Sequence, residues 1–129
     1  MVWSKPCLWY DVVDTFGQTQ RVQGTWERDV AQWLTERGIN WETCRRKASG
    51  HWMPLSDGTT YIPDFYLFGY DVYLDPKIVN ELPRKMSLLE AEYPGRVYML
   101  GLVDGDYIAD LVELLRQLEA GEVTRGMLH

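Results

Sequence analysis

The sequence has few cysteines, no long apolar run and no excess of basic residues. Its two cysteines, Cys7 and Cys44, lie far apart, and neither belongs to a CxxC or Cys/His pattern, which argues against a disulfide framework and a zinc site. The longest apolar run, 97–103, is far shorter than the roughly 18 residues of a membrane span, and residues 1–20 hold no signal-peptide pattern. We therefore expect a soluble, cytoplasmic protein without a membrane partner.

The shortage of basic residues bears on function. Lys and Arg number 13 against 19 Asp and Glu, which gives a net charge of −6 and a pI near 4.8. A protein that binds nucleic acid by charge alone usually has a pI above about 9, so the whole-chain charge argues against that class. Apolar residues make up 46% of 129 residues, enough for one core. We expect a single domain over 1–129, with an N-terminal arm (1–23), a core (24–103) and a C-terminal helix and tail (104–129).

Hydrophobic periodicity predicts the order of the elements. Alternation and turn residues predict an N-terminal β-hairpin, and apolar residues at a 3.6-residue period predict three helices. The hairpin is expected over 8–14 and 18–23, the strands over 41–47, 59–68, 70–77 and 97–103, and the helices over 25–37, 82–93 and after 104–106. Thr25 is the expected N-cap of the first helix, and Gly38 follows its end. Ile108, Leu111, Val112, Leu115 and Leu118 are the expected apolar stripe of the last helix.

Two turns and one crossover define the expected sheet. Asp57-Gly58 precedes the strand 59–68, and Gly69 separates it from the strand 70–77, so three adjacent strands are expected. The strand 70–77, the helix after it and the strand 97–103 then form a parallel crossover. The fold class is α/β (α+β), a mixed β-sheet flanked by helices in the order α-β-β-β-α-β-α after the hairpin arm.

Two acids and a lysine form the most informative constellation. Asp75 and Lys77 are two residues apart on one strand, so their side chains emerge from the same face. If this strand pairs with the one before it, Asp64 meets Asp75. Two carboxylates suit Mg²⁺, which neutralises charge on a phosphodiester, and a lysine can hold the attacking water. Glu27, on the helix expected to cover this sheet, is the candidate third carboxylate.

The motifs resemble those of the PD-(D/E)xK nuclease superfamily. Pro63-Asp64 followed by Asp75-Pro76-Lys77, together with the run Gly24-Thr25-Trp26-Glu27, is similar to the phage endonuclease I branch of Holliday-junction resolvases over about 21–102. The resemblance implies a restriction-endonuclease-like core. It also implies that Glu27, Asp64, Asp75 and the backbone carbonyl of Pro76 are metal ligands, and that Lys77 is the catalytic lysine. Mg²⁺ would be the cofactor, and Mn²⁺ could replace it.

The resemblance further implies an activity and partners. The expected activity is that of a metal-dependent, structure-selective endodeoxyribonuclease that hydrolyses branched DNA in recombination and repair. Members of that branch are homodimers that can exchange N-terminal segments, and a phage-encoded member acts in the host cytoplasm. The chain departs from the family pattern at Asp75, where Glu is common, at Pro76, and at Ile78, where Gly is common.

Candidate DNA contacts and two alternatives complete the sequence-based interpretation. Basic residues that could follow a DNA backbone are Arg45, Arg46, Lys47, Arg84 and Lys85. His51 has no His or Cys at metal spacing, so a structural or surface role is expected. One alternative is a sequence-specific or nicking endonuclease of the restriction or transposon-end type. The other is an inactive DNA-binding or scaffold module that keeps the fold.

Overall fold

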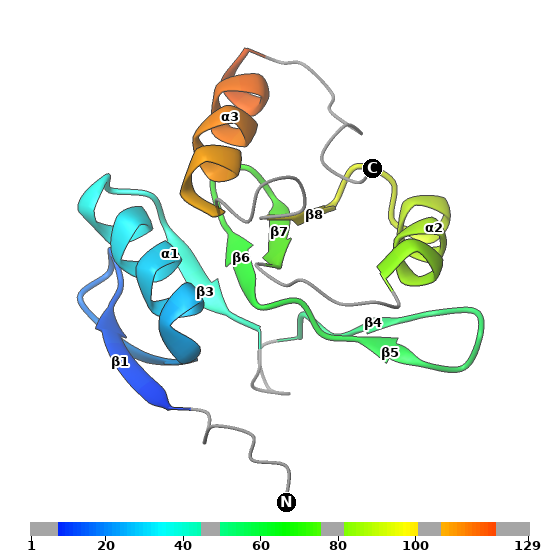
Figure 1. The fold of residues 1–129 in the computed structure, drawn as a ribbon, viewed down its shortest axis with the longest axis horizontal. Helices are drawn as coiled ribbons and strands as arrows, with labels where there is room; N and C mark the ends of the chain where they lie inside the picture. The colour runs from blue at the N-terminus through cyan, green and yellow to red at the C-terminus, as the bar shows by residue number, and fades with distance from the viewer. Residues whose placement is uncertain (1–7, 45–49, 76–81, 101–106, 121–129) are drawn as a thin grey trace, which may run out of the picture.

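A computed structural model describes residues 8–44, 50–75, 82–100 and 107–120. These residues form three helices and eight strands (Figure 1). The mixed α and β composition agrees with the expected fold class. No helix within these ranges is long and apolar enough to span a membrane.

The N-terminal hairpin is present as predicted. Strands β1 (Trp9–Val13) and β2 (Thr19–Gln23) pair antiparallel, with Val12 opposite Gln20. The turn between them is held by Asp14, whose Oδ1 accepts hydrogen bonds of 2.9 Å from the backbone N–H groups of Phe16 and Gln18. The side chains of Val12 and Val22 are buried against the rest of the molecule, which fixes the hairpin to the core.

Helix α1 (Gly24–Glu36) begins directly where β2 ends. The N-cap is therefore Gln23, the last residue of the strand, whose backbone is still extended (φ −109°, ψ 120°), and the prediction of Thr25 as the cap is wrong. Gly24 makes the change of direction with a φ of 85°. The helix ends as predicted before Gly38, which adopts a φ of 70°.

The main sheet has four strands in the order β3-β6-β7-β8. Strand β6 (Phe65–Leu67) pairs antiparallel with both β3 (Trp41–Thr43) and β7 (Val72–Asp75). Strand β8 (Val97–Met99) pairs with β7 in parallel, and helix α2 (Leu82–Glu92) connects the two. The expected crossover and the three adjacent strands are thus confirmed.

The expected strand 59–68 is divided into two. Its first part, β5 (Thr60–Tyr61), pairs with β4 (Met53–Pro54) in a separate hairpin whose turn is Ser56-Asp57-Gly58. Its second part is β6, in the main sheet. Pro63 lies between the two parts, and a proline cannot donate a backbone hydrogen bond to a ladder. The chain therefore leaves one sheet and enters the other at this residue.

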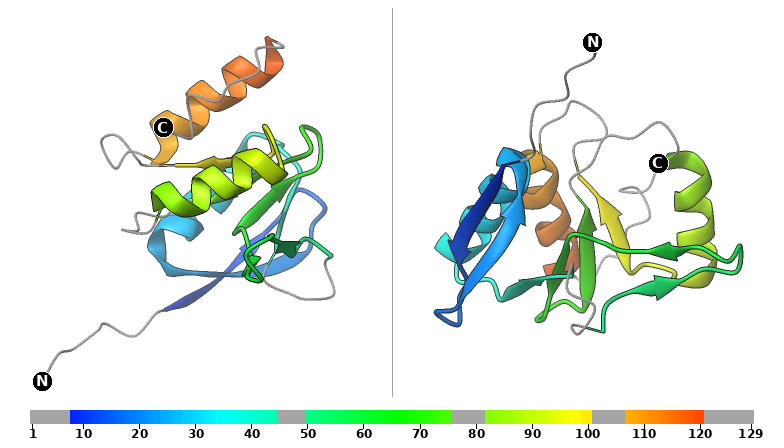
Figure 2. Two further views of the ribbon diagram at one scale, coloured as in Figure 1. Left: turned by 90° about the vertical axis from the view of Figure 1, so that its right-hand side faces the viewer. Right: turned by 90° about the horizontal axis from the view of Figure 1, so that it is seen from below.

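Helices and hairpins cover both faces of the main sheet. On one face, α1, α3 (Tyr107–Glu119) and the β1–β2 hairpin pack together, and on the other face lie α2 and the β4–β5 hairpin (Figure 2). The first face is built from side chains that include Val30, Leu34, Phe65, Leu67, Val72, Leu74 and Leu111. The second includes Cys44, Met53, Leu55, Tyr73, Met86, Leu89 and Met99. We call the second the α2 face.

The apolar stripe of α3 differs from the predicted one by one position. Val112 was expected in the stripe but is half exposed, whereas Leu114 is fully buried. The buried residues of the helix are Tyr107, Leu111, Leu114 and Leu115. The helix is therefore rotated toward Leu114, which packs into the same core cluster as α1.

Candidate active site

Asp64 and Asp75 stand opposite each other on neighbouring strands. Asp64 directly precedes β6 and Asp75 is the last residue of β7, and the strand register pairs Phe65 with Leu74, one position further in. Backbone hydrogen bonds extend across this end of the sheet, from Cys44 N to Asp64 O (3.1 Å) and from Leu100 N to Asp75 O (3.1 Å). Asp64 therefore lies opposite Asp75 across the two strands, as the sequence predicted.

Both carboxylates belong to a row of four residues across the sheet. Cys44, Asp64, Asp75 and Met99 occupy successive strands, since Asp75 pairs with Met99 and Cys44 follows β3. Because side chains alternate between faces along a strand, and Val72 and Leu74 face α1, the side chain of Asp75 faces α2. We call these four residues the carboxylate row.

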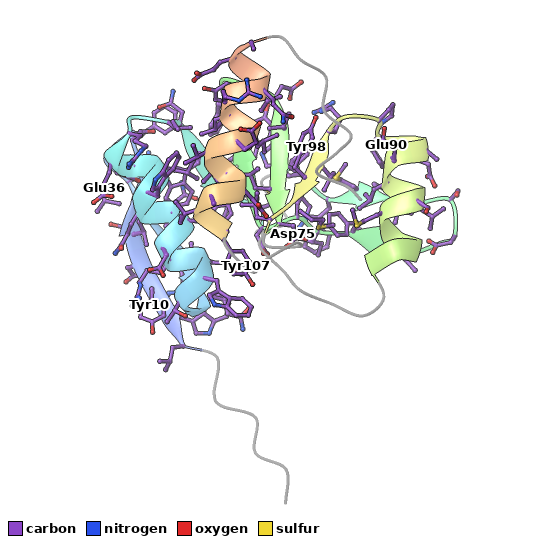
Figure 3. The ribbon with its side chains drawn as sticks, turned by 45° about the horizontal axis from the view of Figure 1, so that its top comes forward. Tyr10, Glu36, Asp75, Glu90, Tyr98 and Tyr107 are labelled. Atoms are coloured by element: carbon purple, nitrogen blue, oxygen red, sulfur yellow. The ribbon has the colours of Figure 1, made fainter. Side chains whose placement is uncertain are left out.

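The carboxylate row is buried. Asp64 is 2% exposed and Asp75 is fully buried, and Figure 3 shows Asp75 near the middle of the molecule. Burial raises the pKa of the Cys44 thiol, and the nearby charges of Glu42, Asp64 and Asp75 raise it further. Two acids in such surroundings are expensive to keep charged unless a cation or hydrogen bonds compensate them, which is typical of functional sites.

Tyr61 reaches the carboxylate row from the β4–β5 hairpin. Its hydroxyl group donates a hydrogen bond to Oδ2 of Asp75 and also lies 3.8 Å from the sulfur of Met99. Burial, together with the negative charge of Asp75, raises the pKa of Tyr61 well above its usual range. The phenol is therefore a neutral donor to Asp75 at neutral pH.

Glu27 has a different environment from the two aspartates. It is buried near the N-terminus of α1, where its Oε1 accepts a hydrogen bond of 3.0 Å from the backbone N–H of Gln23. This contact satisfies one of the N–H groups that a helix start leaves unpaired. Helix α1 covers the sheet as expected, but on the face opposite to the carboxylate row. The role of Glu27 as a third metal ligand stays a prediction.

A second polar group lies beside the carboxylate row on the same face. Nε2 of His51 is 2.5 Å from Oε2 of Glu42, and its Nδ1 is 3.2 Å from the hydroxyl of Tyr73. The imidazole stacks on Tyr66, with ring centroids 4.4 Å apart. Tyr66 pairs with both Glu42 and Tyr73 in the sheet, two residues from Asp64 along β6. His51 thus contacts three side chains of the main sheet, those of Glu42, Tyr66 and Tyr73.

Several predicted site residues lie outside the described part of the chain. Pro76 and Lys77 follow directly after β7, and Arg45, Arg46 and Lys47 follow directly after Cys44. Trp52, on the far side of that basic segment, donates from Nε1 to the backbone oxygen of Cys44 at 3.1 Å. Cys44 and Trp52, the described residues on either side of that segment, are therefore in contact with each other. Arg84 and Lys85 belong to α2, but their side chains are outside the described residues.

The donor chemistry of the carboxylate row fits Mg²⁺. This ion prefers oxygen ligands and commonly takes one or two carboxylates from the protein, with water and substrate phosphate completing its shell. Asp64 and Asp75 supply two such groups. Among the described residues, no group of three His, Cys, Asp or Glu side chains is arranged to hold a metal. Within the described residues, the two aspartates therefore have no third such side chain arranged with them to hold a metal.

Sequence reasoning missed Tyr61 and Cys44 as members of the site. The position of Cys44 follows from the pairing of β3 with β6, which places it next to Asp64. The strand register could have predicted this. The role of Tyr61 depends on how the β4–β5 hairpin packs on α2 and the sheet, and no local pattern in the sequence indicates that packing.

Comparisons with protein-family models, with curated proteins and with solved structures find no match for this chain.

Proposed function

We propose that this protein is a Mg²⁺-dependent DNA endonuclease that hydrolyses phosphodiester bonds in branched DNA, with a restriction-endonuclease-like core. The observation that carries the proposal is the register of Asp64 and Asp75, two buried acids opposite each other on strands β6 and β7. A helix with a buried acid precedes these strands, and a helix and a parallel strand follow them. This order of elements supports the resemblance stated above.

The chemistry follows from the groups that the chain brings together. Asp64 and Asp75 would hold the metal ion, which when bound supplies positive charge to the substrate phosphate and the leaving oxygen. In the hydrolysis, a water oxygen bonds to phosphorus while the bond from phosphorus to a sugar oxygen breaks. The water loses a proton and the sugar oxygen gains one. Lys77, two residues after Asp75, is the group proposed to hold the water, and Pro76 would contribute its carbonyl to the metal.

DNA contacts are proposed for five basic residues. Arg45, Arg46 and Lys47 follow Cys44, and Arg84 and Lys85 lie on α2, which covers the same face. Contacts to phosphate position a protein without reading bases, so they suit a nuclease that selects branched DNA by shape. A homodimer with exchanged N-terminal arms would place one such site on each of two strands.

Cleavage of a four-way DNA junction tests this function. The parent chain should cut the junction with Mg²⁺ or Mn²⁺ and should cut a linear duplex of the same sequence far more slowly. Asp64→Asn and Asp75→Asn should each reduce the rate at least about 100-fold, because each removes a negatively charged metal ligand. Asp29→Asn is the matched control, because Asp29 lies on the exposed side of α1 and should leave the rate unchanged.

Other outcomes separate the alternatives. Equal cutting by the parent and both site variants would show that the aspartates are not the site. Equal cutting of junction and linear duplex would favour a sequence-specific or nicking enzyme. Binding of the junction without cleavage, under all metal conditions, would favour the inactive module.

One observation favours the inactive module as a second candidate. The Glu27 carboxylate accepts a hydrogen bond from the start of its own helix, and that helix lies on the sheet face opposite to the carboxylate row. In such a module, Glu27 would serve only the start of its own helix. A parent chain that binds no Mn²⁺ would favour this candidate over the enzyme.

A further inference from the structure

We propose that Tyr61 is a positioning residue of the metal site, one that orients the Asp75 carboxylate through its hydroxyl group. This inference rests on the proposed function, since it concerns the metal that Asp64 and Asp75 would hold. It assigns the β4–β5 hairpin a role in the site, although the hairpin is not part of the main sheet.

The contact is specific to one oxygen of the carboxylate. The Tyr61 hydroxyl donates to Oδ2 of Asp75, which leaves Oδ1 of that residue as the oxygen not bound by the phenol. A carboxylate can rotate about its χ2 bond, and a hydrogen bond to one oxygen fixes this rotation. Residues that hydrogen-bond to a metal ligand in this way commonly set its orientation, and their loss costs metal affinity.

The phenol is itself held in place by the surrounding residues. Tyr61 packs into the apolar cluster of the α2 face, and its hydroxyl also contacts the sulfur of Met99, the residue that pairs with Asp75 in β8. In β5, Tyr61 pairs with Met53, which is buried. A ring fixed on several sides can hold the carboxylate in a single orientation, which a solvent-exposed donor could not do.

Metal titration of the Tyr61→Phe variant tests the proposal. Phenylalanine keeps the ring and removes only the hydroxyl. The affinity of the DNA-free protein for Mn²⁺, measured by calorimetry, should fall by about 10-fold or more, within the range of about 10 to 100-fold for such residues. Tyr93→Phe is the matched control. It also removes a tyrosine hydroxyl, one whose hydrogen bond of 2.8 Å goes to the backbone oxygen of Pro54 instead of a carboxylate.

A second measurement separates a loss of metal affinity from a loss of stability. The rise in Tm on adding Mn²⁺ is compared with each variant's own metal-free Tm, so that a general destabilisation cancels. The rise should be smaller for Tyr61→Phe than for the parent and for Tyr93→Phe. Unchanged or tighter Mn²⁺ binding by Tyr61→Phe would overturn the inference while leaving the proposed function intact. A parent chain that binds no Mn²⁺ would overturn both.

Discussion

The hydroxyl group of Tyr66 donates a hydrogen bond of 2.7 Å to Oδ1 of Asp71. This bond ties strand β6 to the turn that leads into β7. Arg96, which precedes β8, adds an ion pair of 2.9 Å to the same oxygen and a hydrogen bond to the backbone oxygen of Asp71. Three strands are thus tied together at one turn. A slip of one residue there would move Asp64 and Asp75 to different faces, so this turn maintains the register of the carboxylate row.

The first prediction concerns the acidity of Tyr66. Its hydrogen bond to Asp71, with burial and the nearby charge, raises its pKa to about 12 from the usual value near 10. A folded-state pKa above the unfolded one means that the stabilisation is complete below pH 10 and is lost as the pH rises toward 12. Asp71→Asn should lower the pKa of Tyr66 toward 10, as measured by NMR titration of ¹³C-labelled tyrosine.

Tyr70 provides an internal control for that titration. Burial and a hydrogen bond to Glu119 raise its pKa to about 12 as well, and neither depends on the Asp71 carboxylate. Its pKa should stay unchanged in Asp71→Asn. If the pKa values of both tyrosines shifted equally, the substitution would have altered the turn as a whole. Loss of the hydrogen bond to Asp71 would then not be the cause of the shift in the pKa of Tyr66.

The second prediction concerns the backbone of the same turn. Asp71 has a φ of 54°, a left-handed conformation that costs most side chains about 1–2 kcal/mol and glycine almost nothing. Asp71→Gly and Asp71→Ala both remove the carboxylate, but only alanine is unfavourable in the left-handed conformation of this residue. Asp71→Ala should therefore be less stable than Asp71→Gly by about 1 kcal/mol in urea unfolding.

The same pair of substitutions within a helix should give the opposite order. Asp110 lies in α3, where alanine is favoured over glycine by roughly 0.5–1 kcal/mol. Asp110→Gly should therefore be the less stable variant. If alanine were the more stable residue at both positions, the left-handed conformation of Asp71 would not govern its stability.

Local patterns in the sequence predicted most of the fold. The alternation in 70–77, the helical period after Leu82 and the fully apolar run from Val97 predicted the β7–α2–β8 crossover, because these signals depend only on residues near in sequence. The pairing of Asp64 with Asp75 followed from the same alternation and a short turn. The fold class and the position of Asp64 opposite Asp75 were therefore predictable, while their role as metal ligands stays a prediction.

Features that depend on contacts between distant residues were not predictable in this way. Gly69 was expected to make the tight reversal before β7, but the residue with the left-handed backbone is Asp71, whose side chain is held by Tyr66 and Arg96. Tyr61 was expected in one strand with Asp64, whereas Pro63 separates them into two sheets. That separation is what lets the Tyr61 hydroxyl approach Asp75 from outside the main sheet.

The last prediction is that the candidate site reduces the stability of the metal-free protein. Two carboxylates directly opposite each other on paired strands repel, and both are removed from water. In EDTA, Asp64→Asn should therefore raise the free energy of unfolding, by about 0.5–1 kcal/mol on the scale of cross-strand pairs. Added Mg²⁺ should stabilise the parent more than the variant and reduce or reverse this difference. Urea unfolding with and without Mg²⁺ measures both effects, with Asp29→Asn as the control that should show neither. A less stable Asp64→Asn in EDTA would mean that the contacts of this carboxylate outweigh its repulsion from Asp75, which is the behaviour of a structural residue and not of a metal ligand.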